Sequence, residues 1–433
     1  MPSCLPLLKM ILGFSLYEAR KTLKSFLIEL YGTNCSCKLS MESSSEIKTK
    51  RRVFISTGEV SGDWHGAILI KALRERAALR GMELEIVGLG GDRMAATGVK
   101  ILGNTVGIGS IGAVEALPYI LPTLQVQRDA KKWLKTSPPD VAVLIDYMMP
   151  NQGIGYYAKR TLKIPVIYYI APQEWVWSFD DKNTKAIAAF TDKLLAIFPQ
   201  EAIYYEKQGT NVQWVGHPFV DLMALVPDRV AARQHLGIAD DDLVVTLLPA
   251  SRTQELRSVM PIILEAAKII QTKLPHVKFW LPLSLERYRL EVEKLLKKYD
   301  LQATIISDRS QIAISASDLV LSKSGTVNLE TALLNVPQVI LYRVSAITAW
   351  IARYIVKLQL PFISPVNLVN MESVVPEFVQ NDAIPSAIAE AGLELLVNSQ
   401  SRQTMLDGYA RVRESLGEKG AINRVADSIL DYL

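Results

Sequence analysis

The sequence predicts an α/β protein with two doubly wound, Rossmann-like domains that face each other across a cleft. From Val53 onward, short apolar runs alternate with longer amphipathic stretches, which is the pattern of βαβ units and a parallel sheet. A Pro-containing connector around residues 224–229 divides these units into two consecutive series. The chain has 433 residues, more than one hydrophobic core usually organises, so length also favours two domains.

Each series contains several short apolar runs that we interpret as strands. The first series has them at residues 53–57, 85–88, 141–145, 166–170, 193–197 and 212–215, and the second at 243–248, 277–281, 304–306, 319–321 and 338–341. We therefore expect one domain over residues 51–225 and another over 226–433, whose last helices could pack back on the first domain. In such sheets ligands bind beyond the carboxyl ends of the strands, so the loops after these strands are the candidate site.

Composition indicates a globular protein and limits the classes of partner that it could bind. Apolar residues make up 49% of the chain and charged residues 21%, and no run of 18 apolar residues suggests a transmembrane helix. Any membrane contact is therefore expected to be peripheral, although the mean hydropathy of +0.17 is high. A formal charge of +4 does not indicate nucleic acid, but it is compatible with a modest attraction to anionic lipid.

Residues 1–50 are expected to lie outside the fold, because they contain neither a glycine-rich loop nor a clear strand. They could be an amphipathic appendage, or translation could start at Met41, and a secretory signal fits poorly. All three cysteines, Cys4, Cys35 and Cys37, fall in this segment. This excludes a disulfide framework for the fold, favours a cytoplasmic location, and leaves no metal-binding spacing of cysteines.

The first candidate loop is the stretch GEVSGDWHG, which begins at Gly58 between an expected strand and a helix expected over residues 61–80. Its glycines and the following helix N-terminus could admit a phosphate or a sugar oxygen. Ser61 could instead be only an N-cap, but Glu59 has no turn-forming use and favours a functional site.

The second and third loops follow the next buried strands. Asp146 comes directly after the apolar run VAVLI, where a partly desolvated carboxylate could accept a proton from a sugar hydroxyl, or could simply cap the next segment. Trp175 and Trp177 follow the strand at 166–170 and could stack on a ligand. Packing in the core or an interface is the favoured role for at least one of them.

Two loops of the second series predict phosphate binding. Arg252, in the stretch PASR after a strand, could present its guanidinium to a diphosphate. Ser324, Gly325 and Thr326 form a small-residue loop that opens a helix, and Glu330 further along that helix could reach the hydroxyls of a ribose. Each of these residues also has a purely structural alternative.

An ordered set of motifs resembles the lipid A disaccharide synthase family. The motifs, from about residue 53 to about 379, are GEVSGDWHG, VGLGGDRMAATG, LIDY, YYIAPQEWVW, FPQEAIYYEKQG, VGHP, LPASR, SKSGTVNLETALLNVPQVILYRVS and PVNLV. This resemblance implies the glycosyltransferase B fold and an inverting transferase. It also implies transfer from UDP-2,3-diacylglucosamine to 2,3-diacylglucosamine 1-phosphate, with no metal and no other cofactor.

The resemblance also implies roles for particular residues. Asp146 takes the place of the general base, and Glu59 and Ser61 those of active-site residues of the first domain. Arg252 would meet the UDP diphosphate. The remaining implied binding residues are Ser324, Gly325 and Thr326 for a phosphate, Glu330 for the ribose, and Asn367 in the PVNLV motif.

Some positions depart from the family pattern. Met148 and Met149 stand where the family commonly has a second Asp, and Met371-Glu372 replaces a usual Gly-Arg. Ala250 and Ser178 replace a Gly and an Arg. Two alternatives therefore stay open, a non-catalytic nucleotide-sugar-binding paralogue and a UDP-sugar epimerase of the same fold.

Acylated glucosamine substrates imply peripheral contact with the inner leaflet of the membrane. Two stretches that mix apolar and basic residues, 114–134 and 349–360, are the candidate contact surfaces, although both could be ordinary core-facing helices. A homodimer is a further possibility that the sequence leaves open.

Overall fold

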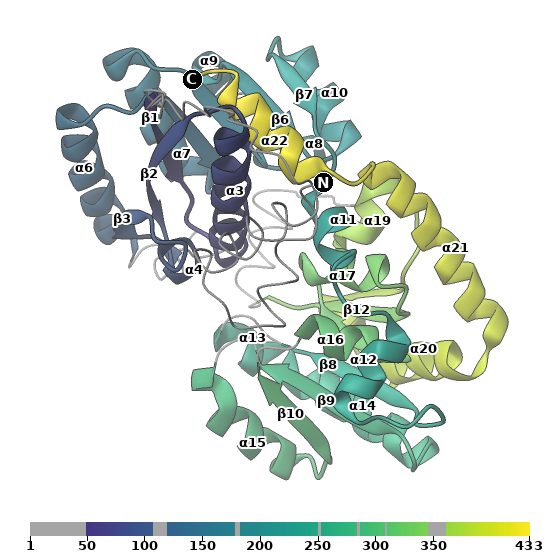
Figure 1. The fold of residues 1–433 in the computed structure, drawn as a ribbon. Helices are drawn as coiled ribbons and strands as arrows, with labels where there is room; N and C mark the ends of the chain where they lie inside the picture. The colour runs from purple at the N-terminus through teal and green to yellow at the C-terminus, as the bar shows by residue number, and fades with distance from the viewer. Residues whose placement is uncertain are drawn as a thin grey trace, which may run out of the picture. The chain divides into compact units, whose positions relative to one another are not determined.

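The computed structural model describes residues 49–106, 119–177, 182–249, 253–283, 286–307, 310–344 and 361–433. Residues 1–48 of the expected N-terminal extension lie outside the described part of the chain. Strand β1 begins at Lys50. The described residues form two parallel sheets flanked by helices, as the alternation of apolar runs predicts (Figure 1).

The first sheet has seven parallel strands in the order β3-β2-β1-β4-β5-β6-β7. Their bounds are β1 Lys50–Ser56, β2 Glu83–Gly90, β3 Lys100–Asn104, β4 Val141–Ile145, β5 Val166–Tyr169, β6 Lys193–Ala196 and β7 Val212–Trp214. All six expected strands are present, and β3 is an additional edge strand. Strand β4 has five buried residues and pairs with β1 and β5, which confirms that this apolar run is a central strand.

The second sheet has six parallel strands in the order β10-β9-β8-β11-β12-β13. Their bounds are β8 Val244–Leu248, β9 Lys278–Leu283, β10 Ala303–Ser307, β11 Leu319–Lys323, β12 Gln338–Tyr342 and β13 Glu377–Val379. The five expected strands are confirmed. Strand β13 was not predicted, because an edge strand of three residues is too short to show a period of two.

Helices connect the strands. In the first series they are α3 Val60–Leu79, α4 Asp92–Ala95, α6 Ile120–Thr136, α7 Met148–Tyr157, η3 Ala158–Leu162, α8 Glu174–Trp177, α9 Lys182–Phe190, α10 Pro199–Lys207 and α11 Pro218–Met223. In the second they are α12 Arg229–Leu236, α13 Thr253–Ser258, α14 Met260–Lys273, η4 Glu286–Tyr288, α15 Arg289–Lys298, α16 Ser310–Ser315, α17 Val327–Leu333, α19 Pro365–Asn370, η6 Gln380–Asp382, α20 Pro385–Val397, α21 Ser399–Leu416 and α22 Ala421–Leu430. None of the described helices is long and apolar enough to span a bilayer.

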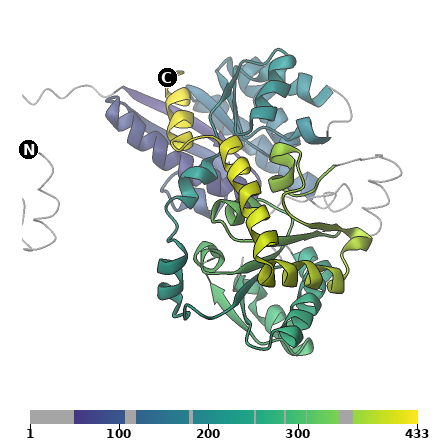
Figure 2. The same ribbon diagram turned by 90° about the vertical axis from the view of Figure 1, so that its right-hand side faces the viewer.

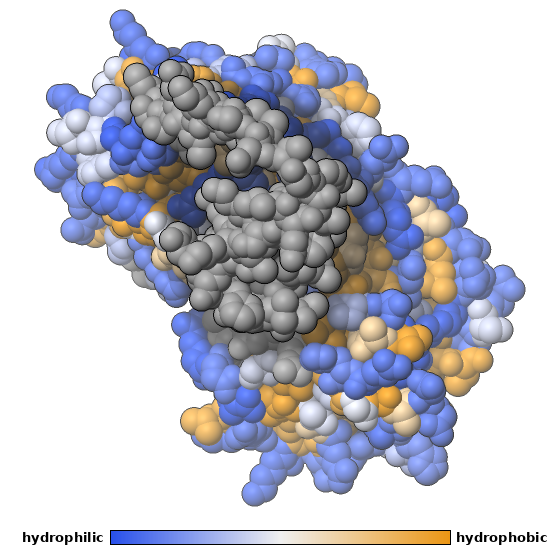
Figure 3. All heavy atoms as spheres, viewed as in Figure 1, coloured by the Kyte–Doolittle hydropathy of each residue, from blue (hydrophilic) through white to orange (hydrophobic). Residues whose placement is uncertain are grey.

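The core follows the period of two along each strand. Val53 and Ile55 of β1 belong to one apolar cluster, whereas Phe54 between them belongs to another on the opposite face of the sheet. The cluster containing Ile55 also includes Val245 and Leu321 of the second sheet. The surface visible in Figure 3 is mainly hydrophilic, with apolar residues exposed in separate places.

The last helix, α22, packs against α3 beside the first sheet (Figures 1 and 2). Arg76 of α3 donates to both carboxylate oxygens of Asp427, at 2.9 and 2.6 Å. Asp221 of α11 accepts from the backbone N–H of Gly420 and Ile422 at the start of α22. The C-terminal end of the chain is thereby attached to elements of the first series.

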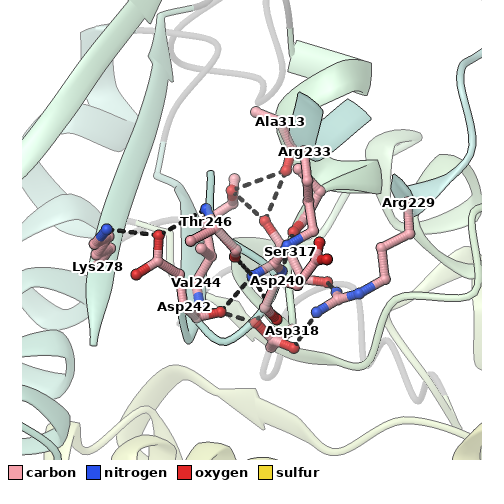
Figure 4. Close-up of polar contacts among 12 residues, drawn as sticks. Arg229, Arg233, Asp240, Asp242, Val244, Thr246, Lys278, Ala313, Ser317 and Asp318 are labelled. Carbon is pink, nitrogen blue, oxygen red and sulfur yellow. Dashed lines mark hydrogen bonds and ion pairs between the residues drawn. The ribbon is translucent and has the colours of Figure 1, made fainter. Parts of the chain in front are cut away.

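A polar network joins α12 to the amino ends of β8 and β11 (Figure 4). Asp318 accepts from the Arg229 guanidinium at 2.6 Å and from the backbone N–H of Val244 at 2.9 Å. The buried Arg233 lies 3.6 Å from the same carboxylate and donates to the carbonyl of Ala316 at 3.0 Å. This network is at the edge of the sheet opposite the loops that carry the candidate site.

Candidate functional site

The loop after β1 leads into helix α3, and Glu59 is the N-cap residue of that helix. Its backbone is extended, and its side chain makes no capping hydrogen bond. Ser61 is the second residue inside the helix, so it is not the N-cap that one interpretation of the sequence proposed. The glycines allow close packing, because a Cβ on Gly58 would lie 2.3 Å from the ring of Tyr147. Glu59 and Tyr147 are also close enough that the carboxylate raises the pKa of the phenol, after burial as the larger cause.

Asp146 follows β4 with a left-handed backbone, φ 48°, and Tyr147 continues it with φ 55°. Two consecutive non-glycine residues in this region are strained, which is a frequent property of functional loops. Two hydrogen bonds to the Asp146 carbonyl stabilise this conformation. They come from the Asn151 amide at 2.7 Å and the Tyr168 hydroxyl at 2.9 Å. The Asp146 N–H donates to the carbonyl of Ile170, the residue that follows the neighbouring strand β5. The carboxylate of Asp146 is thus presented at the carboxyl edge of the sheet by a backbone held on both sides.

Asn151 is fully buried and links the ends of β1 and β4. Its amide nitrogen also reaches the carbonyls of Ile145 at 3.1 Å and Ser56 at 3.3 Å, and its oxygen accepts from the Ser56 hydroxyl at 2.7 Å. Asn151 was not among the predicted site residues. Its position five residues after Asp146, near the start of the helix that follows this loop, was the available signal.

Asp63 links the two glycine-rich motifs of the first series, GEVSGDWHG and VGLGGDRMAATG. This buried carboxylate accepts from the backbone N–H of Gly91 at 2.7 Å, Arg93 at 3.0 Å and Met94 at 3.1 Å, and so caps α4. The Arg93 guanidinium lies 5.8 Å from the ring centroid of Trp64. The motif VGLGGDRMAATG therefore places an exposed arginine beside the loop that contains Glu59.

Glu201 holds the loops after β5 and β6. Its buried carboxylate accepts from the backbone N–H of Ala171 at 3.1 Å, Ile197 at 2.8 Å and Phe198 at 3.2 Å. Burial raises the pKa of Glu201 to about 7, against the opposing effect of these hydrogen bonds. Trp175 packs 5.9 Å from the ring of Phe198, which gives it the packing role.

Two buried histidines, His65 and His217, pack against the ring of Phe219. Burial lowers the pKa of His65 to about 4 and that of His217 well below its usual value, with a smaller contribution to the latter from His65. His65 stacks on Phe219 with centroids 5.5 Å apart, and His217 accepts from the Phe219 N–H at 3.1 Å. Both rings are therefore neutral packing residues at physiological pH.

In the second sheet, the loop after β11 contains Ser324, Gly325 and Thr326. The Ser324 hydroxyl donates to the carbonyl of Ile363 at 2.9 Å, and the Gly325 N–H donates to the Asn328 side chain at 2.7 Å. Thr326 is exposed, and among the described residues the backbone N–H groups of Thr326 and Val327 have no acceptor. These two N–H groups, rather than that of Gly325, are therefore available to an anion.

Glu330 lies one turn further along α17 and is buried. Its carboxylate accepts from the Gln311 amide at 2.9 Å. Burial raises the pKa of Glu330, while the Gln311 hydrogen bond and the positive charge of Arg93 act in the opposite direction. Arg93 of the first series and Glu330 of the second therefore interact electrostatically.

Asn367 is buried, and its side chain makes four hydrogen bonds within the protein. The oxygen accepts from the N–H of Val374 and Val375, and the nitrogen donates to the carbonyl of Val375 and to Glu377, all at 2.8 or 2.9 Å. Glu377 also accepts from the N–H of Ser364 at 2.8 Å. A direct hydrogen bond from Asn367 to a ligand would replace one of these contacts, so its clear role is to shape the loop.

The residues that depart from the family pattern differ in their surroundings where they are described. Met371 has a left-handed backbone, φ 53°, at the place of the usual glycine. Glu372 pairs with Arg411 of α21 at 2.5 Å, so its negative charge is compensated locally. Met149 is the second residue of α7 and is 77% exposed.

The structure groups the expected residues at the carboxyl edges of the two sheets. Glu59, Ser61 and Asp146 follow the neighbouring strands β1 and β4. Ser324 to Thr326, Glu330 and Asn367 follow β11 and β12. Arg252, Ala250 and Ser178 lie outside the described residues, as does the stretch 349–360. In the part of the chain that is described, no three His, Cys, Asp or Glu side chains form a group that could hold a metal ion.

Comparison with known proteins identifies the fold and the family. A family model described as lipid-A-disaccharide synthetase matches residues 53–428. The lipid-A-disaccharide synthases of Gloeothece citriformis and Synechocystis sp. are 54% and 51% identical over 88% of this chain, covering 100% and 98% of those proteins.

Solved structures with similar folds include a putative UDP-N-acetylglucosamine 2-epimerase from Listeria monocytogenes and MurG from Acinetobacter baumannii. The first has a TM-score of 0.60 at 16% identity, over 89% of this chain and 97% of its own. The second has a TM-score of 0.53 at 13% identity, over 88% and 99%. At these identities the likeness shows only the fold, which is the glycosyltransferase B fold. The family match does not favour the epimerase or the non-catalytic alternative.

Proposed function

Because this chain belongs to the lipid-A-disaccharide synthetase family and is a glycosyltransferase of lipid A biosynthesis, we propose that it acts on the substrates of that reaction. The donor is UDP-2,3-diacylglucosamine and the acceptor is 2,3-diacylglucosamine 1-phosphate. The products are the disaccharide 1-phosphate and UDP. The observation that carries the proposal is the match of residues 53–428, which includes every loop of the candidate site.

Asp146 is the proposed general base. Its carboxylate takes the proton of the attacking acceptor hydroxyl while that oxygen forms the new bond to the anomeric carbon. The bond from this carbon to the UDP oxygen breaks on the opposite face, so the configuration inverts. The hydrogen bonds from Asn151 and Tyr168 to the Asp146 backbone support this role, because they hold the carboxylate at the edge of β4. Glu59 and Ser61 are proposed to contact the acceptor beside it.

The second series is proposed to bind UDP. The free N–H groups of Thr326 and Val327 suit a phosphate oxygen, and Arg252 is proposed to meet the diphosphate. Glu330 is proposed to accept from the ribose hydroxyls, with Ser324, Gly325 and Asn367 shaping the surrounding loops. In this proposal protein N–H groups and a guanidinium balance the leaving charge, and no metal or other cofactor takes part.

We further propose that the chain acts at the cytoplasmic face of the membrane, where acylated substrates reside. The support is the start of α6, where Ile120, Leu121 and Leu124 are 46%, 77% and 57% exposed. The domain boundaries at residues 50 and 225 and a homodimer remain predictions.

The test is turnover of the two substrates by the purified protein, measured as UDP release and disaccharide formation. We expect Asp146→Asn to lower kcat by at least about 100-fold, as expected for loss of a general base. Asp407→Asn, an exposed carboxylate on α21, is the matched control and should retain full activity. Unchanged turnover by Asp146→Asn would exclude it as the base. Conversion of the donor alone, without an acceptor, would support an epimerase instead.

A further inference from the structure

A groove of about 380 Å³ lies between α6 and α7. Its lining contains Arg128, Lys131, Lys132 and Lys135, together with Leu124 and Tyr157. Gln127 completes it, so four lining side chains are basic and none is acidic. No role in sugar transfer accounts for this concentration of positive charge.

The groove is built by specific contacts between the two helices. Tyr157 donates to the carbonyl of Lys131 at 3.2 Å, and Gln127 donates to the carbonyl of Pro150 at 2.9 Å. Gly153 of α7 faces the same space, because a Cβ there would lie 3.0 Å from the Gln127 side chain and 3.6 Å from the Lys131 amine. The absence of a side chain at Gly153 therefore lets Gln127 and the Lys131 amine pack closely against α7 at the wall of the groove.

The positive charge in the groove is largely uncompensated. Among the described residues Lys132 alone of the four has an ion-pair partner, Asp129 at 3.5 Å, and both of these side chains are exposed. The amine of Lys131 lies 5.7 Å from the centroid of the Tyr157 ring, and burial lowers the pKa of Lys131. A partly buried amine without a carboxylate partner gains from a bound anion.

The position of the groove along α6 distinguishes a lipid headgroup from other anions. Leu124, Arg128, Lys131 and Lys135 recur every three or four residues, so they share one face of the helix. The apolar side chains at 120, 121 and 124 precede the cations on that helix. A helix with exposed apolar residues at one end and cations further along suits a membrane surface, where phosphate groups lie just above the acyl chains.

We propose that the groove between α6 and α7 binds the phosphate of an anionic phospholipid headgroup, so that the protein docks preferentially on negatively charged membrane. This inference rests on the proposed function only for the presence of a membrane, and it is tested without turnover. It adds a lipid preference that neither the donor nor the acceptor sugar explains.

The experiment is co-sedimentation of the full chain with phosphatidylcholine vesicles that contain or lack phosphatidylglycerol. We expect the wild type to bind the anionic vesicles more tightly. In the triple variant Arg128→Gln, Lys131→Gln, Lys135→Gln, the affinity for anionic vesicles should fall by about fivefold for each cation removed. The matched control is Lys294→Gln, Lys297→Gln, Lys298→Gln on α15, which removes the same charge from exposed positions. Thermal unfolding of both variants checks that they are folded.

Three results would overturn the proposal. The first is equal binding of the wild type to both vesicles, and the second is an equal loss in the two triple variants, which would indicate non-specific attraction. The third is displacement from vesicles by inorganic phosphate at constant ionic strength, which would indicate a free-phosphate site. Loss of binding to both vesicle types in the variant Ile120→Ser, Leu121→Ser, which changes no groove-lining residue, would show that these apolar side chains are needed for membrane association. If such a variant still preferred phosphatidylglycerol at high lipid concentration, the groove proposal would be supported separately.

Discussion

The side-chain amide of Asn151 donates a 2.7 Å hydrogen bond to the backbone carbonyl of Asp146, the residue proposed as the general base. The same amide reaches the carbonyls of Ile145 and Ser56, so one buried side chain joins the ends of two neighbouring strands. A left-handed backbone at a non-glycine residue costs about 1–3 kcal/mol and persists only when its surroundings hold it. Asn151 supplies much of that support at Asp146.

We predict that Asn151→Ala lowers both stability and turnover. The substitution leaves the carbonyls of Ser56, Ile145 and Asp146 and the Ser56 hydroxyl without this partner, so the unfolding free energy should fall by about 2–4 kcal/mol. The Asp146 carboxylate should also lose its fixed position. This should lower kcat, with a smaller change in KM for the acceptor. Chemical denaturation and steady-state kinetics at a temperature where the variant is folded measure the two effects.

Asn211→Ala is the control, because its amide also donates to a carbonyl, that of Asp192, at an exposed position. It should change stability by less than about 1 kcal/mol and leave kcat unchanged. If Asn151→Ala loses stability but keeps full kcat when folded, the residue does not position the base.

The pKa of Glu201 predicts a pH dependence of stability. Burial raises it from 4.5 to about 7 in the folded protein, so between these pH values the native state keeps a proton that the unfolded chain has released. The unfolding free energy contributed by this group therefore falls as pH rises through that window, by up to about 3 kcal/mol, and is constant above it. Denaturant unfolding at a series of pH values between 4.5 and 8 measures the slope.

Glu201→Gln should remove this contribution to the slope, because an amide does not titrate. The variant should also be less stable at all pH values, since its NH2 group cannot accept from the Ala171 N–H. Glu206→Gln, at an exposed position on the same helix, should keep the wild-type slope. Identical slopes for the wild type and Glu201→Gln would contradict the prediction.

Asp318 is predicted to stabilise the second sheet without affecting ligand binding. Asp318→Ala leaves the buried Arg233 and the Val244 N–H without their shared acceptor, so the unfolding free energy should fall by about 3–5 kcal/mol. Asp300→Ala, which removes an exposed pair with Lys268, should cost less than about 1 kcal/mol. UDP affinity below the melting temperature should be unchanged in both. A weaker affinity in Asp318→Ala alone would mean that the network reaches the binding edge.

Glu330 is predicted to bind the nucleotide through its charge. Glu330→Gln keeps the size and an acceptor for Gln311 but replaces charge-assisted hydrogen bonds with neutral ones, so the Kd for UDP should rise by about tenfold. Isothermal titration with UDP measures this change. Glu390→Gln, on the exposed side of α20, should bind like the wild type. Equal affinities for all three proteins would argue against the ribose role.

Local pattern explains which features were predicted from the sequence. Strand β4 is a continuous apolar run, and the loops that contain Gly58 and Gly325 interrupt the pattern at strand ends, so both kinds of feature are visible within a few residues. The same logic missed β13, because three residues show no period. It also missed the clamp of Asn367 by Glu377, which forms only when the loop closes on itself.

The sequence by itself determined the two α/β series, their order of strands along the chain, and the loops that meet at the carboxyl edges, because these follow from apolar periodicity and glycine placement. Only the tertiary structure decided which side chains support which loop. The hydrogen bonds of Asn151 to Asp146, of Gly91 to Asp63 and of Arg76 to Asp427 depend on how distant segments pack. Hydrogen bonds and charges act over a few ångströms in space, and no local pattern encodes which remote residue fills that distance.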